Sequence, residues 1–267
     1  IKAIEELSGI DAQTEKIYQE VLFLYGTELF NKGELDAAEQ NFKKSLKYNL
    51  NKTFNLRAQY WLAQTYYQKG DYATAIYGFE KLDRNVEEFP EKQQLSYDLG
   101  YAYFKSKNFE KAKECYKNAE SWDNYIRVCD ILTNYFDIAK IYEKYKNDYN
   151  NAKKYYLLAE RFDFAGRVYE KLGQYNIAAE IYEIISKDYP LALKNYEKSE
   201  LWDEAIRVAL KIEDYKEAAF IYEKKKKDYF NAKKYYEKAE AWDEYANCCK
   251  LLNFDFDYAK VYEEKLK

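Results

Sequence analysis

The stretch "AEAWDEY" at residues 239–245 closely matches three earlier stretches, "SELWDEA" at 199–205, "AERFDFA" at 159–165 and "AESWDNY" at 119–125. The spacing is 40 residues each time, and residues 107–267 align with themselves at this offset without a gap. Regular self-similarity of this period predicts a solenoid, in which each unit buries its apolar face against its neighbours. The repeating columns are aromatic (Trp122, Phe162, Trp202, Trp242), alanine (Ala112, Ala152, Ala192, Ala232 and Ala139, Ala179, Ala219, Ala259) and Tyr-Glu (Tyr142-Glu143, Tyr182-Glu183, Tyr222-Glu223, Tyr262-Glu263).

Each 40-residue unit divides into three stretches of about twelve residues, as residues 201–240 show. In the third stretch, Tyr and Ala recur with the i, i+3, i+7 spacing of an amphipathic helix. Asp214 and Asp228 stand where a helix N-cap is expected, and Gly173 stands at a turn. We therefore predict an all-α fold of about 16–17 short helices, held by packing because helices this short are marginally stable alone.

The first 120 residues use longer stretches, at residues 24–46, 60–82 and 97–119, and each stretch predicts a pair of helices. These three pairs resemble tetratricopeptide repeats. The resemblance rests on a small residue (Gly26, Ala63, Gly100), a turn position seven residues later (Gly33, Gly70, Lys107), an alanine (Ala38, Ala75, Ala112) and an aromatic four residues beyond it (Phe42, Phe79, Tyr116).

The resemblance extends over residues 17–267, with Gly166 and Gly173 in the family's two glycine columns. It implies one α-solenoid over residues 1–267, a right-handed superhelix of stacked antiparallel helix pairs. Residues 17–106 are expected to form regular helix pairs, and residues 107–267 four 40-residue units. The later units depart from the family by a third helical segment, and the family's proline after the second helix is missing.

Some stretches are also similar to subgroups of this family. Residues 58–76 and 95–112 are similar to the repeats of bacterial envelope proteins, whereas residues 217–244 are similar to eukaryotic vesicle-fusion adaptors and intraflagellar-transport subunits. Both subgroups are scaffolds. The lack of a membrane-spanning apolar run predicts a soluble segment, cytoplasmic or in the bacterial periplasm, and the first of these similarities suggests a bacterial source.

The composition gives no support to an active site. The chain has no histidine, which removes the commonest general base and nitrogen metal ligand. Its four cysteines lack metal-ligand or disulfide spacing and are expected to be small buried residues, and its eight glycines form no phosphate-binding loop. No apolar run is long enough to span a bilayer. We predict no catalytic residue, no metal site and no cofactor, and the net charge of −4 disfavours nucleic acid.

In tetratricopeptide arrays the first helix of each repeat lines a concave groove, so the resemblance implies a groove for a peptide or helix of a partner protein. Chaperone-binding members clamp a carboxylate there with Lys and Asn, which these positions lack. The rings suit peptide binding, because Tyr offers large contact area with a polar hydroxyl, yet each ring can equally be explained by packing between helices. The implied groove residues are Phe23, Thr27, Phe30, Tyr60, Gln64, Tyr67, Tyr97, Tyr101 and Phe104.

In the later units the same columns carry an acidic residue and, four positions on, Arg127, Arg167, Arg207 and finally Asn247. Such i, i+4 pairs stabilise a helix by roughly 0.2–0.5 kcal/mol, and this alone explains them. The alternative is a ladder of arginines that binds carboxylates of a partner, with Asp123, Asp163, Asp203 and Asp243 holding them in orientation. The basic run 224–227 suits a helix C-terminus better than a phosphate or membrane patch.

The sequence therefore predicts a non-catalytic protein–protein interaction scaffold that is part of a larger protein or complex. The alternative is a nucleic-acid-binding or sensor array, since helical repeats also present Tyr and Arg to bases. The chain starts at Ile1 and contains no Met, which predicts a trimmed or processed chain. No polar capping helix precedes Lys267, so we expect further chain or a partner to cover that end.

Overall fold

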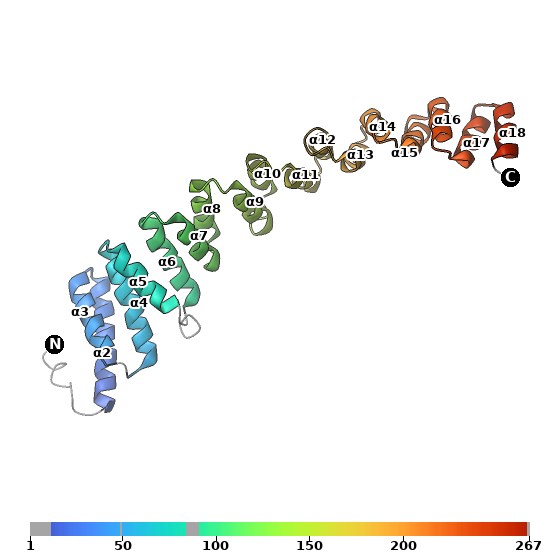
Figure 1. Cartoon of the computed structure of the whole chain (residues 1–267). Coiled ribbons are helices and arrows are strands. Elements are labelled where there is room, and N and C mark those ends of the chain that lie inside the picture. Colours follow the sequence, from blue (N-terminus) through green and yellow to red (C-terminus); the bar gives the residue numbers. More distant parts are fainter. Residues whose placement is uncertain (1–11, 49, 84–90, 266–267) are drawn as a thin grey trace. The chain divides into compact units, whose positions relative to one another are not determined.

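The computed structural model describes residues 12–48, 50–83 and 91–265, and every regular element in these ranges is helical (Figure 1). They contain 17 α-helices and two π-helical segments, which confirms the predicted all-α repeat fold. Lys267, where we expected the end to be covered, lies outside these ranges. None of the described helices is both long and apolar enough to cross a membrane.

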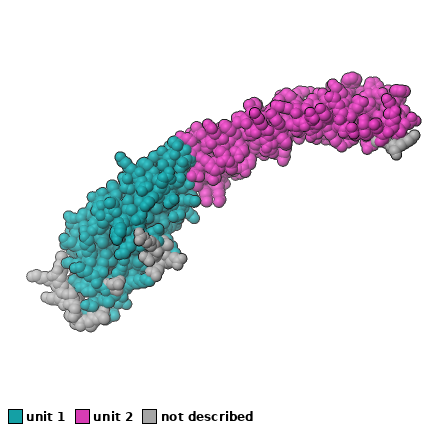
Figure 2. Space-filling model, in the orientation of Figure 1, with its two compact units in different colours: residues 1–134 teal, residues 135–267 magenta. Residues whose placement is uncertain are grey.

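The helices form two compact units, residues 1–134 and 135–267 (Figure 2). The change from helix pairs to three-helix units was predicted near residue 107, and that domain organisation stays a prediction. In unit 1, consecutive helices pack side by side (Figure 1). Its helices are α2 (Ala12–Asn31), α3 (Leu35–Leu46), α4 (Lys52–Gln68), α5 (Tyr72–Asp83), α6 (Lys92–Lys105), α7 (Phe109–Asn118) and α8 (Trp122–Ile131).

In the core of unit 1, aromatic rings of one helix pack against small residues of the neighbouring helix. Phe42 of α3 is fully buried and lies against Gly26 of α2, where an added Cβ would come within 2.8 Å of the ring. Gly33 and Gly70 have φ of +80°, a region that favours glycine, so these turns need no strained side chain. The small-residue and aromatic columns of the sequence thus explain how helix pairs approach closely.

Unit 2 consists of short helices in the order that the 40-residue repeat predicts. The prediction of three helical segments per repeat is confirmed. In two of the repeats, one of these segments continues into a π-helical turn. The elements are α9 (Tyr135–Lys144), α10 (Tyr149–Leu158), α11 (Phe162–Lys171), α12 (Tyr175–Glu180), η2 (Ile181–Ser186), α13 (Tyr189–Lys198), α14 (Trp202–Lys211), α15 (Tyr215–Ile221), η3 (Tyr222–Lys226), α16 (Tyr229–Lys238), α17 (Trp242–Leu251) and α18 (Asp255–Glu264).

The connections between these helices repeat one backbone geometry. From residue 107 onward, a left-handed residue follows each helix at steps of 13 or 14 positions, and only Gly173 among them is a glycine. Asp214 and Asp228 accept hydrogen bonds from the backbone N–H groups of Glu217 and Asn231, which confirms both predicted N-caps. The left-handed residues are Lys107, Glu120, Thr133, Asn147, Glu160, Gly173, Lys187, Glu200, Glu213, Lys227, Glu240 and Asn253.

Candidate partner-binding sites

The predicted groove residues do not all lie at a surface. Phe23 of α2 is only 6% exposed, and its ring lies 5.4 Å from Phe54 and 6.2 Å from Phe42. Phe30 is half-buried, with its ring 5.1 Å from that of Trp61 on α4. Phe23 therefore packs in the core of unit 1, and Phe30 lies at its edge.

Tyr60 and Gln64 take part in a polar network between α4 and α6. The Tyr60 hydroxyl donates to Asp98 Oδ2 at 2.5 Å, and Gln64 Nε2 donates to the Tyr60 oxygen at 3.1 Å. Burial raises the pKa of the Asp98 carboxyl, although hydrogen bonds from Tyr60 and Gln94 act in the opposite direction. This network fixes the orientation of the Tyr60 ring, so Tyr60 has a structural role besides any contact with a ligand.

Tyr67, Tyr97 and Tyr101 form a cluster of half-buried rings on α4 and α6. The Tyr67 and Tyr101 centroids lie 5.8 Å apart, and the Tyr97 ring is stacked on Tyr101 at 6.3 Å. Burial and the neighbouring tyrosines raise the pKa of Tyr67 to about 12, so its hydroxyl stays protonated at neutral pH. We call the set Tyr60, Gln64, Tyr67, Tyr97 and Tyr101 the tyrosine surface.

Two cations lie beside this surface. Lys105 Nζ is 5.5 Å from the centre of the Tyr101 ring. The Arg127 guanidinium lies 4.7 Å from the centre of the Phe104 ring, within the range of a cation–π contact. The predicted residues Phe104 and Arg127 therefore come together, on α6 and α8.

The arginines of unit 2 have partners other than the predicted aspartates. Arg207 donates from Nη2 to Glu183 Oε2 at 2.8 Å, and its Nη1 bonds Oε1 of the same carboxylate. Asp203, expected to orient Arg207, instead bonds Lys226 and is 81% exposed. The expectation was wrong for this pair, because a buried carboxylate attracts a guanidinium more strongly than a solvated one. Arg167 lies 4.3 Å from the Phe164 ring centre.

A recurring arrangement that we call the glutamate junction joins consecutive repeats. At each junction a glutamate accepts a hydrogen bond from a tyrosine hydroxyl and forms an ion pair with a cation that lies later in the chain. Tyr156 and Tyr196 donate at 2.7 Å and 2.9 Å. The junctions are Glu39 with Tyr66 and Lys69, Glu80 with Tyr103 and Lys111, Glu143 with Tyr156 and Lys171, and Glu183 with Tyr196 and Arg207.

At three of these junctions, neighbouring cations keep a partly buried glutamate ionised. Hydrogen bonds from Lys43 and Lys69 lower the pKa of Glu39 to about 2. At Glu183, the hydrogen bond from Arg207 outweighs burial and lowers the pKa of the carboxyl. Burial favours the protonated form of Glu143, but hydrogen bonds from Lys171 and Tyr156 lower its pKa as well. Glu39, Glu143 and Glu183 are thus anions held between helices.

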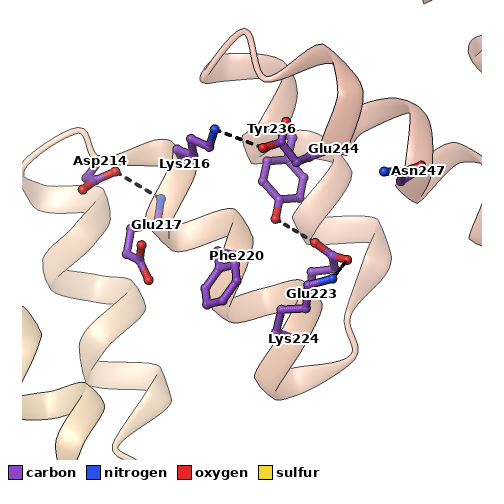
Figure 3. Close-up of a pocket in the computed structure, with 9 residues that line it drawn as sticks. All are labelled: Asp214, Lys216, Glu217, Phe220, Glu223, Lys224, Tyr236, Glu244 and Asn247. Carbon is purple, nitrogen blue, oxygen red and sulfur yellow. Dashed lines mark hydrogen bonds and ion pairs between the residues drawn. The ribbon is translucent and has the colours of Figure 1, made fainter.

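A fifth glutamate, Glu223, lies in a pocket of about 400 Å³ formed by α15, η3, α16 and α17. It accepts from the Tyr236 hydroxyl at 2.7 Å, as at the other junctions. Its cation is the adjacent Lys224, at 2.5 Å, rather than a residue of a later helix. Figure 3 shows Tyr236 and Lys224 pointing at this carboxylate. The predicted residue Asn247 also lines the pocket.

The sequence did not reveal the roles of the junction glutamates, although the column that contains Glu143, Glu183 and Glu223 was noted there. The available signal was a second column, Tyr156, Tyr196 and Tyr236, which follows the glutamates at a constant 13 positions. Burial raises the pKa of Cys115 to about 12 and that of Cys248 to about 11, so neither thiol is activated. The residues that the structure describes include no group of three or more His, Cys, Asp or Glu suited to a metal ion.

Three family models described as tetratricopeptide repeats match the chain, at residues 24–86, 94–125 and 165–192. A search of curated protein sequences finds no match.

Among solved structures, a tetratricopeptide repeat protein from Parabacteroides merdae is 16% identical over 84% of this chain and 92% of its own, with a TM-score of 0.42. The TPR2AB domain of yeast Sti1, in its pHSP90 complex, is 15% identical over 91% of this chain and 98% of its own, with a TM-score of 0.39. Pseudomonas aeruginosa pilF is 14% identical over 78% of this chain and 96% of its own, with a TM-score of 0.34. At these low TM-scores, no residue role is carried over from them.

Proposed function

We propose that this chain, which belongs to the tetratricopeptide-repeat proteins, is a non-catalytic scaffold that binds a peptide or helix of a partner protein on the tyrosine surface. The repeats themselves support a general role in protein–protein interaction. The observation that supports this particular surface is the gathering of Tyr67, Tyr97 and Tyr101 on two neighbouring helices. Their rings are only half-buried and so retain area for a ligand.

The chemistry of this surface fits a peptide with an apolar residue and an acidic neighbour. The rings supply contact area at low entropic cost, because a tyrosine side chain has few rotatable bonds. Lys105 and Arg127 place positive charge beside the rings, where an acidic side chain of the peptide would be attracted. The Asp98 carboxylate is directed at Tyr60 and Gln94, whose hydrogen bonds it accepts.

The test uses a display library of random peptides, selected on the immobilised chain. We expect the enriched peptides to bind the wild-type chain and to lose at least about 30-fold in affinity to the double variant Tyr67→Ala/Tyr101→Ala. Loss of aromatic anchors costs about 2 kcal/mol or more in interfaces, and 1.4 kcal/mol corresponds to about tenfold. Fluorescence anisotropy of labelled peptides measures the affinity.

The matched control is Tyr77→Ala, which removes a ring on α5 that is 67% exposed and lies outside the tyrosine surface. This variant should bind the peptides as the wild type does. Circular dichroism and thermal melting verify that the double variant is folded. If no peptide is enriched, or if the folded double variant binds as tightly as the control, the tyrosine surface is not the binding site.

A further inference from the structure

The junction at Glu183 and the pocket at Glu223 are 40 residues apart and differ in one respect. At the first, Arg207 donates hydrogen bonds to both carboxylate oxygens of Glu183, and the Tyr196 hydroxyl donates to Oε2. At the second, the Tyr236 hydroxyl again donates to Oε2 of the glutamate. The tyrosine half of the junction is therefore the same, and the difference lies in the cation.

Both cation columns of the repeat are lost at the second site. Arg167 and Arg207 are followed at the next 40-residue position by Asn247, a neutral residue. Lys171 bonds Glu143 at 2.6 Å. Its counterparts at the next two 40-residue positions are Lys211 and then Leu251, which has no charge. Helix α17 therefore offers Glu223 no charge where α11 and α14 offered one to the preceding junctions.

Lys224 only partly replaces the missing cation. Its Nζ reaches Oε1 of Glu223, but its side chain is 52% exposed, whereas that of the glutamate is 11% exposed. An ammonium makes a single contact, whereas the planar guanidinium of Arg207 spans both oxygens of its carboxylate. Space remains beside the carboxylate, since the pocket of about 400 Å³ falls within the roughly 300–1,000 Å³ of small-ligand sites.

We propose that the pocket at Glu223 binds the guanidinium of an arginine side chain presented by a partner protein, in the position that Arg207 occupies at the preceding junction. The pocket is lined by the acidic residues Asp214, Glu217, Glu223 and Glu244 and by two lysines, which favours a cation. Among these carboxylates, Glu223 is the one that would meet the guanidinium, because Tyr236 donates to it as Tyr196 donates to Glu183, the partner of Arg207.

The charges on the ligand backbone distinguish the source of the guanidinium. Free arginine carries an α-ammonium and an α-carboxylate, which lose hydration on entering a pocket, whereas an arginine within a peptide has neutral amides in that place. The assignment to a partner rests on the proposed scaffold function. The pocket is in unit 2, away from the tyrosine surface in sequence, so each site can fail without the other.

The test is a titration of the isotope-labelled full chain with N-acetyl-arginine methylamide, followed by nuclear magnetic resonance. Saturable shifts are expected at Asn247 and Lys224 and at the backbone around Tyr236. The citrulline analogue, which has the same shape and no charge, should bind at least tenfold more weakly. Free arginine should also bind more weakly than the blocked amide.

Two variants extend the comparison between repeats. Asn247→Arg supplies the cation in the chain itself, at an exposed position, and should abolish the shifts while raising the melting temperature. Arg207→Asn removes the cation at Glu183 and should create a second set of saturable shifts there. Thermal melting verifies folding of both variants, and Glu223→Gln serves as a further test if Arg207→Asn does not fold.

Three results would overturn the inference. The first is equal binding of the citrulline analogue, and the second is unchanged binding to folded Asn247→Arg or to Glu223→Gln. The third is tighter binding of free arginine than of the blocked amide, which would assign the pocket to an amino acid rather than to a partner. The peptide experiment at the tyrosine surface is unaffected by any of them.

Discussion

At the scale of single residues, the most unusual feature is a backbone conformation. Glu120, Glu160, Glu200 and Glu240 all have φ between 53° and 58°, in the left-handed region. L-residues are disfavoured there because Cβ approaches the following carbonyl oxygen. Each of these helices therefore ends in a backbone conformation that glutamate disfavours. The packing of the helices on both sides must stabilise that conformation.

Replacing Glu160 with glycine should stabilise the chain by about 0.5–1 kcal/mol. Relief of a strain of roughly 1–2 kcal/mol outweighs the extra entropy of glycine in the unfolded chain, about 0.5–1 kcal/mol. Urea unfolding measures the change. Glu180→Gly is the control, since Glu180 has a helical φ of −60° and should lose stability on the same substitution. A loss of stability in Glu160→Gly would contradict the expected relief of strain.

At the scale of elements, paired polar groups join neighbouring helices beside the apolar core. Where a cation is present, the glutamate is ionised, as at Glu143, Glu183 and Glu39. Where two acids meet, the opposite holds. Glu197 of α13 faces Glu217 of α15, and burial together with this neighbour raises the pKa of Glu197 to about 7, with Asp214 acting in the same direction and Lys225 against it.

The raised pKa of Glu197 predicts how stability changes with pH. Between the ordinary pKa of a glutamate, about 4.3, and about 7, the folded state binds a proton that the unfolded state has lost. The stability that the folded state gains by binding this proton therefore falls as pH rises through that window, and it is absent above it. Glu197→Gln mimics the protonated form, so it should raise the urea midpoint at pH 8 and leave it nearly unchanged at pH 4.5.

The control for this pH dependence is Glu237→Gln. Glu237 is the counterpart of Glu197 40 residues on, and it is exposed. Comparing each variant with the wild type removes the common effect of other carboxylates, such as Glu183, whose lowered pKa costs stability only at more acidic pH. Equal midpoint changes for the two variants at pH 8 would show that Glu197 has no special interaction.

At the scale of the whole molecule, each helix of a unit packs mainly on the helices next to it in sequence. In repeat arrays of this kind, stability is approximately a sum of repeat and nearest-neighbour terms. A substitution in one helix should therefore destabilise mainly that helix and its neighbours. Unit 2 offers a test within one unit, because Val168 of α11 and Val208 of α14 are equivalent and both fully buried.

Val168→Ala should cost about 1–3 kcal/mol, since it leaves a cavity in the core. Amide hydrogen exchange should accelerate in α10, α11 and α12 while α16 and α17 keep their protection. Val208→Ala should move the affected region to α13, α14 and α15. Uniform acceleration throughout unit 2 in either variant would show that the unit opens as one cooperative body.

The sequence by itself determined the helices and their order. Alanine columns, aspartate N-caps and the 40-residue period are local or periodic signals, and they predict an all-α repeat because helix formation depends on residues three and four positions apart. The family resemblance also placed Tyr67, Tyr97 and Tyr101 among the groove positions, and their rings lie next to one another.

Only the tertiary structure decided which of these side chains remain accessible and which partner each one takes. Phe23 and Tyr97 occupy equivalent positions of the predicted groove, yet Phe23 is buried against two neighbouring rings, whereas Tyr97 is only half-buried. Arg207 bonds Glu183, 24 positions away, rather than Asp203, four positions away. Such choices depend on the distance and burial between packed helices, and these quantities are absent from any local pattern of residues.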